Sequence, residues 1–260
     1  MTERAAAAPD WQPRWRQLVD GVRRVSSGEG EAQLLDSLAR PDRPLVLAFV
    51  NAHAMNSAAV SRPFFDAVMA ADVVLRDGAG MAILLRLLGQ APGRNLNGTD
   101  LIPKLVRRYA GRTIALFGTR EPYLPRAQEI VKSRLAPGSA CIAAHGFLDT
   151  ACYVRLAAAH RPSLIVLGMG MPRQEEVARA LRAALHYPCL VVCGGAIIDF
   201  LGGKTSRAPA WMRGLGLEWV FRLALEPKRL FKRYVIGNPL FIARALSLAA
   251  ASGRGGRAAT

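Results

Sequence analysis

Short, continuous apolar runs alternate with amphipathic stretches through the middle of the chain. A run such as PLVLAFV is typical of a strand that is buried on both faces of a parallel sheet. Runs of this kind predict strands over residues 44–50, 71–80, 112–118, 139–147, 163–170 and 189–196. Helical spacing of apolar residues predicts helices over residues 57–70, 81–89, 100–109, 122–136, 151–161 and 172–185. We expect Thr99 or Asp100 to cap the third of these helices. This alternation predicts an α/β fold with a mostly parallel sheet and helices on both faces.

The pattern changes at both ends of the chain. Residues 1–30 are rich in Ala, Arg, Pro and Gly and end near SSGEGE, which predicts a flexible N-terminal extension. Residues 31–201 hold the alternating pattern and form the predicted α/β domain. Helices continue without strands over residues 202–248, which we interpret as a helical appendage. The Gly- and Arg-rich residues 249–260 predict a disordered tail.

Composition predicts a sizeable core and an anionic partner. Of the 260 residues, 51% are hydrophobic and 21% are charged, which excludes a disordered chain. The chain has 35 Lys and Arg against 19 Asp and Glu, a net charge of +16. A surplus this large favours nucleic acid, phospholipid head groups or a phosphorylated substrate as the partner. Residues 204–235 alone contain eight basic and two acidic side chains, interleaved with aromatic residues, which suits a membrane interface or a nucleic-acid face.

The cysteines and the apolar segments bear on the cellular compartment. The four cysteines, Cys141, Cys152, Cys189 and Cys193, predict reduced core thiols, because no second Cys or His pair lies at metal-ligand spacing. The first fifteen residues lack the apolar core of a signal peptide. No uninterrupted apolar run approaches about 20 residues, so we expect no segment that spans a bilayer. These features predict a cytoplasmic protein that can still meet a membrane surface.

Glycine-containing turns follow five of the six predicted strands. They lie at residues 77–80, 118–119, 146–147, 168–170 and 194–195. Ligands of doubly wound sheets bind beyond the carboxyl ends of the strands. Glycine at these ends lets backbone N–H groups approach a phosphate closely. Ordinary tight turns explain one such glycine, but five at successive strand ends indicate a ligand site.

Three polar residues at the strand ends are candidates for chemistry. Asp77 ends the second predicted strand, where it fits a general base that deprotonates a hydroxyl and fits a helix N-cap equally well. Asn51 ends the first strand and fits either a hydrogen bond to a polar ligand or an Asx turn. His53, two residues later, is interpreted as a solvent-facing or capping histidine.

A further candidate site lies in the segment MGMPRQE. Gln174 and the N–H groups at this helix start can meet a diphosphate or a sugar, although a proline-initiated helix explains the same residues. The chain contains no G-x-G-x-x-G, no G-x-x-x-x-G-K-[ST] and no Asp-X-Asp. These absences argue against a nicotinamide cofactor, a P-loop and a metal–nucleotide complex on paired carboxylates. We therefore expect neither a metal nor a cofactor.

Several longer motifs resemble the WecG/TagA/CpsF glycosyltransferases. VNAHAMNSA, ADVVLRDGAGM, NGTDL, IVLGMGMPRQE, CGGAIIDFLGG, RAPAWM, GLEWVFRL and EPKRLFKRY occur in the order of that family, over residues 45–234. The resemblance implies a Rossmann-like fold and an inverting, metal-independent transfer of a sugar from a UDP-sugar. The implied acceptor is a sugar on a polyprenyl diphosphate, used in cell-surface polysaccharide biosynthesis. It also implies that the appendage works at the anionic inner face of the bacterial cell membrane.

The resemblance and the strand ends together give a set of expected site residues. Asp77 matches the catalytic base of the family. Donor or substrate contacts are expected from Asn51, Gly78, Asn97, Asp100, Gly118, Gly170, Gln174 and Glu175. Contacts to the acceptor diphosphate are expected from Arg207, Arg222, Arg229 and Lys232, the last standing where many members have an arginine.

Two positions near the expected pocket depart from the family pattern. Phe49 stands where many members have Thr, and Asn95 where many have Arg, although Arg94 is adjacent. The donor is therefore predicted only as a hexose or N-acetylhexosamine.

Two other functions remain as alternatives. A nucleotide-dependent oxidoreductase is disfavoured because the dinucleotide-binding fingerprint is missing. A nucleic-acid-binding protein is disfavoured because the basic residues do not lie on a recognised nucleic-acid-reading helix or strand. Self-association is left open.

Overall fold

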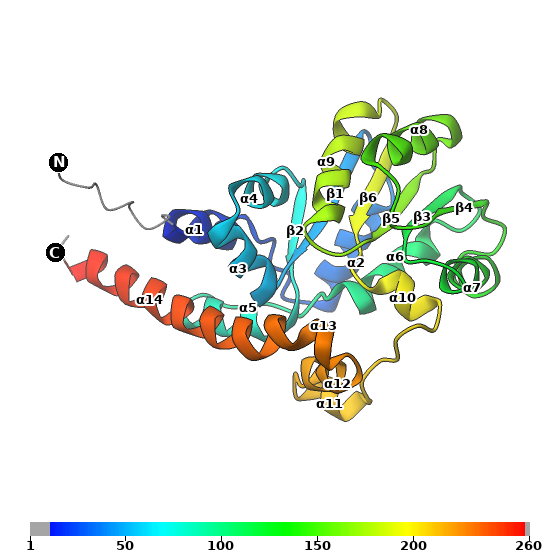
Figure 1. Ribbon diagram of the computed structural model, residues 1–260. Helices are drawn as coiled ribbons and strands as arrows, with labels where there is room; N and C mark the ends of the chain where they lie inside the picture. The colour runs from blue at the N-terminus through cyan, green and yellow to red at the C-terminus, as the bar shows by residue number, and fades with distance from the viewer. Residues whose placement is uncertain (1–10, 258–260) are drawn as a thin grey trace, which may run out of the picture.

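The structure is a computed structural model that describes residues 11–257 (Figure 1). Within them, six parallel strands form one sheet in the order β2-β1-β6-β5-β3-β4. The strands are β1 (Pro44–Val50), β2 (Val73–Arg76), β3 (Ile114–Gly118), β4 (Cys141–Ala144), β5 (Leu164–Gly168) and β6 (Cys189–Cys193). The predicted α/β class and the parallel sheet are confirmed.

Helices cover both faces of this sheet (Figure 1). Those before β3 are α1 (Trp11–Gly21), α2 (Gly28–Leu38), α3 (Ala52–Val60), α4 (Arg62–Met69), α5 (Gly78–Leu87) and α6 (Gly98–Arg108). Those between β3 and the appendage are α7 (Tyr123–Ile130), the π-helical turn η1 (Val131–Leu135), α8 (Thr150–His160), α9 (Arg173–Ala184) and α10 (Ile197–Leu201). The appendage contains α11 (Ala210–Gly214), α12 (Glu218–Leu225), α13 (Pro227–Phe231), the π-helical turn η2 (Lys232–Ile236) and α14 (Gly237–Arg257).

Strand β1 shows why the apolar runs predict central strands. Leu47 and Phe49 pack into one core cluster with α2 and α6, whereas Val46 and Ala48 pack into another with α8 and α9. Successive side chains of a strand point to opposite faces, so a strand covered on both sides needs an unbroken apolar run. Since all six strands are parallel, their carboxyl ends meet at one edge of the sheet.

Several element boundaries differ from those predicted. Helix α5 starts at Gly78 rather than at residue 81, so the end of the predicted strand 71–80 is helical. The helix predicted over residues 57–70 is two helices, α3 and α4, because Ser61 adopts an extended backbone and its hydroxyl caps α4 at Phe64 N. The helix predicted from Asp100 starts at Gly98. Asn97 is its N-cap, and its Oδ1 accepts a hydrogen bond from Asp100 N at 3.0 Å.

The predicted flexible extension is wrong for residues 11–30. Trp15, Leu18 and Val19 form a helical stripe on α1 that is buried in the core cluster shared with α3 and α14. The indole Nε1 of Trp15 donates to the carbonyl oxygen of Met55 at 2.7 Å. After α1, the chain pairs with the edge strand β2, and Ser27 caps α2. Residues 1–10 lie outside the described residues.

The C-terminal helix α14 is longer than predicted. It continues to Arg257, so the disordered tail predicted from residue 249 is helical over most of its length; residues 258–260 are not described. Phe241, Ala245 and Leu248 on one side of α14 are buried, with the ring of Phe241 5.3 Å from that of Trp15. The helix therefore docks on the α/β domain along one stripe.

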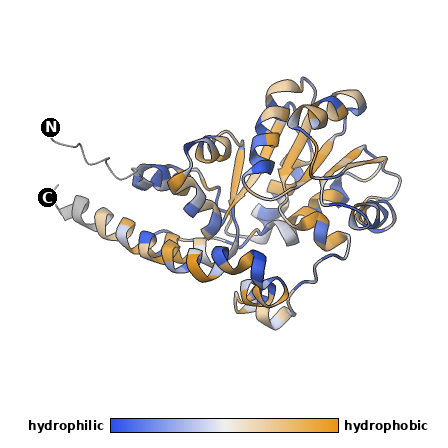
Figure 2. Cartoon of the chain, viewed as in Figure 1, coloured by the Kyte–Doolittle hydropathy of each residue, from blue (hydrophilic) through white to orange (hydrophobic). Residues whose placement is uncertain are grey.

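The same region contains one helical stretch, Pro227–Ser252, that is long and apolar enough to cross a membrane by length and composition alone. Only 17% of its most apolar stretch is buried. The stretch is therefore a candidate span by this criterion, although it contains no uninterrupted apolar run of about 20 residues. Its first turns contain Lys228, Arg229, Lys232 and Arg233, and Arg244 follows in the apolar part. Figure 2 shows hydrophilic and hydrophobic residues mixed along this helix.

Candidate active site

Two adjoining cavities lie at the edge where the strands end. The first encloses about 240 Å³ and the second about 280 Å³. Five residues line both cavities: Asn51, Asp77, Thr99, Arg222 and Arg233. The α/β domain supplies the first three and the appendage the last two. The appendage therefore completes a site that begins at the sheet.

The first cavity is bordered by the glycine turns after β4, β5 and β6. Gly146, Gly168, Gly170, Gly194 and Gly195 line it, as the strand-end argument predicts for a ligand site. A Cβ on Gly168 would lie only 2.7 Å from the side chain of Ile198, so the turn after β5 packs tightly on α10. Gly118 does not line either cavity. A Cβ there would lie 2.4 Å from the carbonyl oxygen of Gly168, so this glycine serves strand packing.

Asp77 occupies the N-cap position of α5 but makes no capping hydrogen bond with its side chain. Of the two interpretations given to this residue, the structure favours a carboxylate that faces the cavities. Asn51 Nδ2 donates to Asp77 Oδ2 at 3.4 Å. Gly78, which follows Asp77 and lines the second cavity, has a φ of +85° and its N–H donates to Asn95 Oδ1 at 3.0 Å.

Opposing effects act on the ionisation of Asp77. Burial raises its pKa, while the hydrogen bond from Asn51 and the charges of Arg233, Arg222 and Arg76 act in the opposite direction, and the net shift is upward. A carboxylate with a raised pKa is a stronger base than an ordinary aspartate. Asp77 therefore has the position and the electrostatics of a general base.

Asn51 and His53 both belong to the start of α3. Asn51 Oδ1 accepts a hydrogen bond from Ala54 N at 3.1 Å, so this residue caps the helix and contacts Asp77 with the same side chain. His53 lines the second cavity. Burial and the nearby charge of Arg233 lower its pKa to about 4, so the ring is neutral near pH 7 and can accept a hydrogen bond.

Gln174 and Glu175 form a buried pair at the start of α9. Gln174 lines the first cavity, and its Oε1 accepts a hydrogen bond from Gly195 N at 2.9 Å. Its Nε2 donates to Glu175 Oε1 at 2.8 Å. Burial raises the pKa of Glu175 to about 7, and this residue lines neither cavity. The pair holds the glycine turn after β6 in place.

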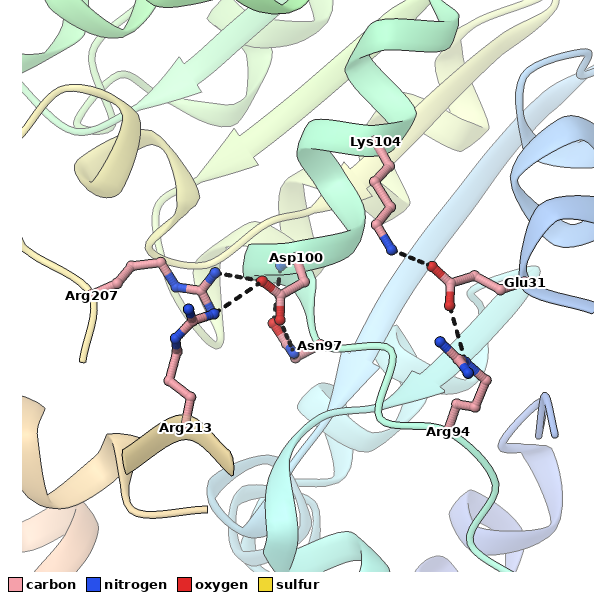
Figure 3. Close-up of polar contacts among 7 residues, drawn as sticks. All are labelled: Glu31, Arg94, Asn97, Asp100, Lys104, Arg207 and Arg213. Atoms are coloured by element: carbon pink, nitrogen blue, oxygen red, sulfur yellow. Dashed lines mark hydrogen bonds and ion pairs between the residues drawn. The ribbon is translucent and has the colours of Figure 1, made fainter. Parts of the chain in front are cut away.

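Asp100 connects α6 to the appendage (Figure 3). Its Oδ1 forms an ion pair with Arg207 and lies 3.8 Å from Arg213 Nη1. Asn97 Nδ2 donates to its other oxygen at 2.8 Å, and Asn97 lines the second cavity. Burial opposes ionisation of Asp100, but the hydrogen bonds from Arg207 and Asn97 and the charges of both arginines lower its pKa overall. Neither Asp100 nor Arg207 lines a cavity, so the structure places them as a clamp beside the site.

The expected basic residues divide according to where their side chains lie. Arg222 lines both cavities and Arg229 lines the first, where it also pairs with Glu226. Lys232 is exposed and lines neither, in contrast to the prediction. Its neighbour Arg233 lines both instead. The η2 turn directs the side chain of Arg233 into the cavities. The sequence KRY alone does not show which of its two basic side chains takes this direction.

Arg222 and Arg233 each carry an unpaired guanidinium donor at the cavities. The Nε atoms of both are buried without a hydrogen-bond partner within the described residues. An unpaired buried donor is costly unless a ligand satisfies it. A diphosphate between the two cavities would supply the missing acceptors.

Three further polar residues line the first cavity and were missed by the sequence analysis. Thr119 Oγ1 donates to Asp199 Oδ1, which also accepts from Lys204 Nζ at 3.0 Å. The motif CGGAIIDFLGG contains Asp199, but an acid in the short helix α10 carries no signal that it faces a cavity. Among residues 11–257, no group of three or more His, Cys, Asp or Glu side chains is placed to hold a metal ion.

The departures from the family pattern also lie at the site. Phe49 lines the first cavity and Asn95 the second. Arg94 does not take the place of the missing arginine, because its Nε lies 3.1 Å from Glu31 Oε2 (Figure 3). Glu31 also pairs with Lys104, so this buried carboxylate holds Arg94 beside α2 and α6, and Arg94 lines neither cavity.

The chain matches the model of the glycosyl transferase WecG/TagA/CpsF family over residues 20–254. It belongs to this family. The match includes the α/β domain and the appendage through most of α14. This protein is therefore a glycosyltransferase, and the oxidoreductase and nucleic-acid-binding alternatives are set aside.

Two curated relatives have similar sequences. The chain is 26% identical over 187 residues to a protein of Bacillus subtilis (strain 168), covering 71% of this chain and 73% of that one. It is 24% identical over 190 residues to a protein of Staphylococcus aureus (strain NCTC 8325 / PS 47), covering 72% and 74%. Both are named N-acetylglucosaminyldiphosphoundecaprenol N-acetyl-beta-D-mannosaminyltransferase.

Proposed function

We propose that this protein transfers a hexose or N-acetylhexosamine from a UDP-sugar to a sugar on a polyprenyl diphosphate, with inversion at the anomeric carbon and without a metal. One observation carries the proposal: Asp77, a carboxylate free of capping contacts, lies where two cavities adjoin. A transferase needs its base between two substrates, and a hydrolase of one substrate would not need the second cavity.

The first cavity suits the nucleotide-sugar donor. Its glycine turns carry no side chains that would fill the space, and Lys204 and Arg229 add positive charge beside them. Phosphates bind where such cations converge. The second cavity suits the acceptor sugar, because it combines neutral His53, Asn97 and Asn238 with the indole of Trp219.

The transfer step then follows from the position of Asp77. Its carboxylate takes the proton of an acceptor hydroxyl as the hydroxyl oxygen attacks the anomeric carbon of the donor. The bond from that carbon to the UDP oxygen breaks, and the bonding electrons leave with UDP. Attack from the side opposite UDP inverts the anomeric carbon. Asn51 orients the carboxylate through its 3.4 Å hydrogen bond.

Negative charge grows on the diphosphate as UDP leaves. Fixed positive groups placed at such a charge lower the barrier, because they need no reorganisation during the step. Lys204 and Arg229 line the first cavity, where this group lies in the proposal. They replace the metal ion that other transferases use, while Arg222 and Arg233, which border both cavities, hold the diphosphate of the acceptor.

The relatives and the appendage support a lipid-linked acceptor. The names of both relatives give N-acetylglucosamine on a diphosphoundecaprenol as the acceptor of those proteins. Among the residues whose exposure the structure describes, ten of the fifteen exposed large hydrophobic residues lie between residues 211 and 246, next to a strongly basic segment. We propose that this surface rests on the anionic inner leaflet, because α14 uses one stripe to dock on the α/β domain and cannot be surrounded by lipid there. Bacterial cell-surface polysaccharide synthesis would use such a product.

The experiment is a panel of UDP-hexoses and UDP-N-acetylhexosamines with N-acetylglucosaminyl-diphosphate-prenol as acceptor, read by product mass. We expect one donor to give a product heavier by one sugar, and equal rates with and without excess EDTA. Transfer to no prenyl-diphosphate acceptor from any donor would refute the proposed function. Loss of rate in EDTA that Mg²⁺ restores would refute the metal-independent part alone. The panel also identifies the donor sugar, which the family pattern does not predict because Phe49 and Asn95 replace residues common in the family at the cavities.

A further inference from the structure

The second cavity has an apolar wall whose residues continue toward the surface of the molecule. Ile83 of α5, Trp219 of α12, and Phe241 and Ile242 of α14 form this wall. Helix α5 runs beside α14, as Figure 1 shows, and the two helices are in contact. A Cβ on Gly80 would lie 3.4 Å from the ring of Phe241, so the first turns of both helices meet at the cavity.

Each of the two helices continues this wall outward with a row of apolar residues. On α5 the row is Ala79, Ile83 and Leu87, spaced four residues apart. On α14, Leu246 follows Ile242 at the same spacing. Residues four apart lie on the same side of a helix, so both rows start at the cavity and proceed along neighbouring helices. Ile83, Leu87 and Leu246 are all exposed, which is unusual for large apolar residues that serve only a core.

We propose that these two rows bind the first isoprene units of the polyprenyl chain that carries the acceptor sugar. This inference rests on the proposed function. Arg222 and Arg233, with unpaired buried Nε atoms, fix a diphosphate at the inner end of the second cavity. The polyprenyl hydrocarbon bonded to that diphosphate must extend away from the polar groups around Asp77. The apolar wall between α5 and α14 is the side of the cavity that can contact a hydrocarbon.

The dimensions agree with this occupant. The row from Ala79 to Leu87 spans about 12 Å at the rise of an α-helix, a length of about two to three isoprene units. Contacts with these units would draw the sugar-diphosphate toward Asp77 before the remaining chain enters the bilayer. The rows would therefore favour acceptors with several isoprene units over acceptors with one.

The test measures kcat/KM for N-acetylglucosaminyl-diphosphate-prenols with one and with three isoprene units, below micelle-forming concentrations and without vesicles. For the wild-type enzyme we expect kcat/KM to be about 10-fold or more higher for the three-unit acceptor, because its additional isoprene units bury several more methylene groups. In Leu87→Ser and in Leu246→Ser, the ratio of the two values should fall to about 1–3. Met69→Ser is the matched control, since Met69 on α4 and Leu87 are both 38% exposed, and it should keep the wild-type ratio.

Each other outcome overturns the inference. Equal kcat/KM for both acceptors in the wild-type enzyme, or an unchanged ratio in both leucine variants, would show that the rows do not bind the chain. A preference for longer chains that appears only when vesicles are added would show that the rows contact bilayer lipid instead. Failure of the proposed function is distinct, because then no acceptor of any length gains a sugar.

Discussion

At the scale of single residues, Asp77 decides whether the site performs base catalysis. Asp77→Asn keeps the shape and the contact with Asn51 but removes the base, and general-base catalysis contributes roughly 10²–10⁴-fold. We expect kcat to fall by about that factor while binding of UDP, measured by calorimetry, and the thermal midpoint stay close to wild type. Because only the ionised form acts as a base and burial raises the pKa of Asp77, kcat/KM of the wild type should rise with pH through a range above that of an ordinary aspartate. Turnover of the variant within twofold of wild type would exclude this role.

A comparison of Arg233 with Lys232 tests the direction of the η2 turn. Arg233 borders both cavities with a buried, unpaired Nε, while Lys232 is exposed. A hydrogen bond to a charged group contributes about 1.5–3 kcal/mol, so Arg233→Ala should lower kcat/KM by about 10- to 150-fold. Lys232→Ala should change it less than twofold in detergent solution, where membrane attraction plays no part. The opposite order of the two effects would mean that the lysine contacts the diphosphate.

At the scale of elements, the ion pairs of Asp100 hold the appendage on the first turn of α6. Arg207 and Arg213 reach this carboxylate from residues that precede α12, and Arg207 also lies 3.7 Å from Glu218. Asp100→Asn should release the segment and raise its rate of limited proteolysis by about fivefold, the factor for about 1 kcal/mol. The matched control is Asp36→Asn, since Asp36 pairs with Arg108 away from both cavities and the appendage. An equal proteolysis rate for both variants would show that apolar docking of α14 alone positions the segment.

The strands and the glycine turns could be predicted because their causes are local. A strand covered on both faces needs an apolar run, and a ligand edge needs small residues, whatever the rest of the chain does. The spacing of Trp11, Trp15 and Leu18 is compatible with an amphipathic helix, but the docking of α1 on the core could not be predicted. Trp15 is ordered by Met55 and by Phe241, which lies near the other end of the chain. Likewise, Asp100 belongs to a recognisable motif, but only the path of the appendage shows that its partner is Arg207 rather than a ligand.

At the scale of the whole molecule, the structure changes how membrane binding must be tested. Removal of the chain from residue 202 onward would delete Phe241, Ala245 and Leu248 and uncover Trp15, so a truncated domain would lose part of its core. Substitutions on the exposed side of the appendage avoid this problem. Trp211 and Phe231 are more than half exposed and line neither cavity.

We therefore expect the full chain to bind phosphatidylglycerol vesicles more tightly than phosphatidylcholine vesicles. The preference should weaken between 50 and 500 mM NaCl, because the Debye length decreases from more than 10 Å toward about 4 Å. The double variant Trp211→Ser, Phe231→Ser should lower the vesicle partition coefficient by about 10-fold, from the apolar area that no longer enters the interface. Val60→Ser, on α3 and also highly exposed, should have no effect. Equal binding of the full chain to both lipids at all salt concentrations, with no loss in the double variant, would show that the appendage completes the site without contacting the membrane.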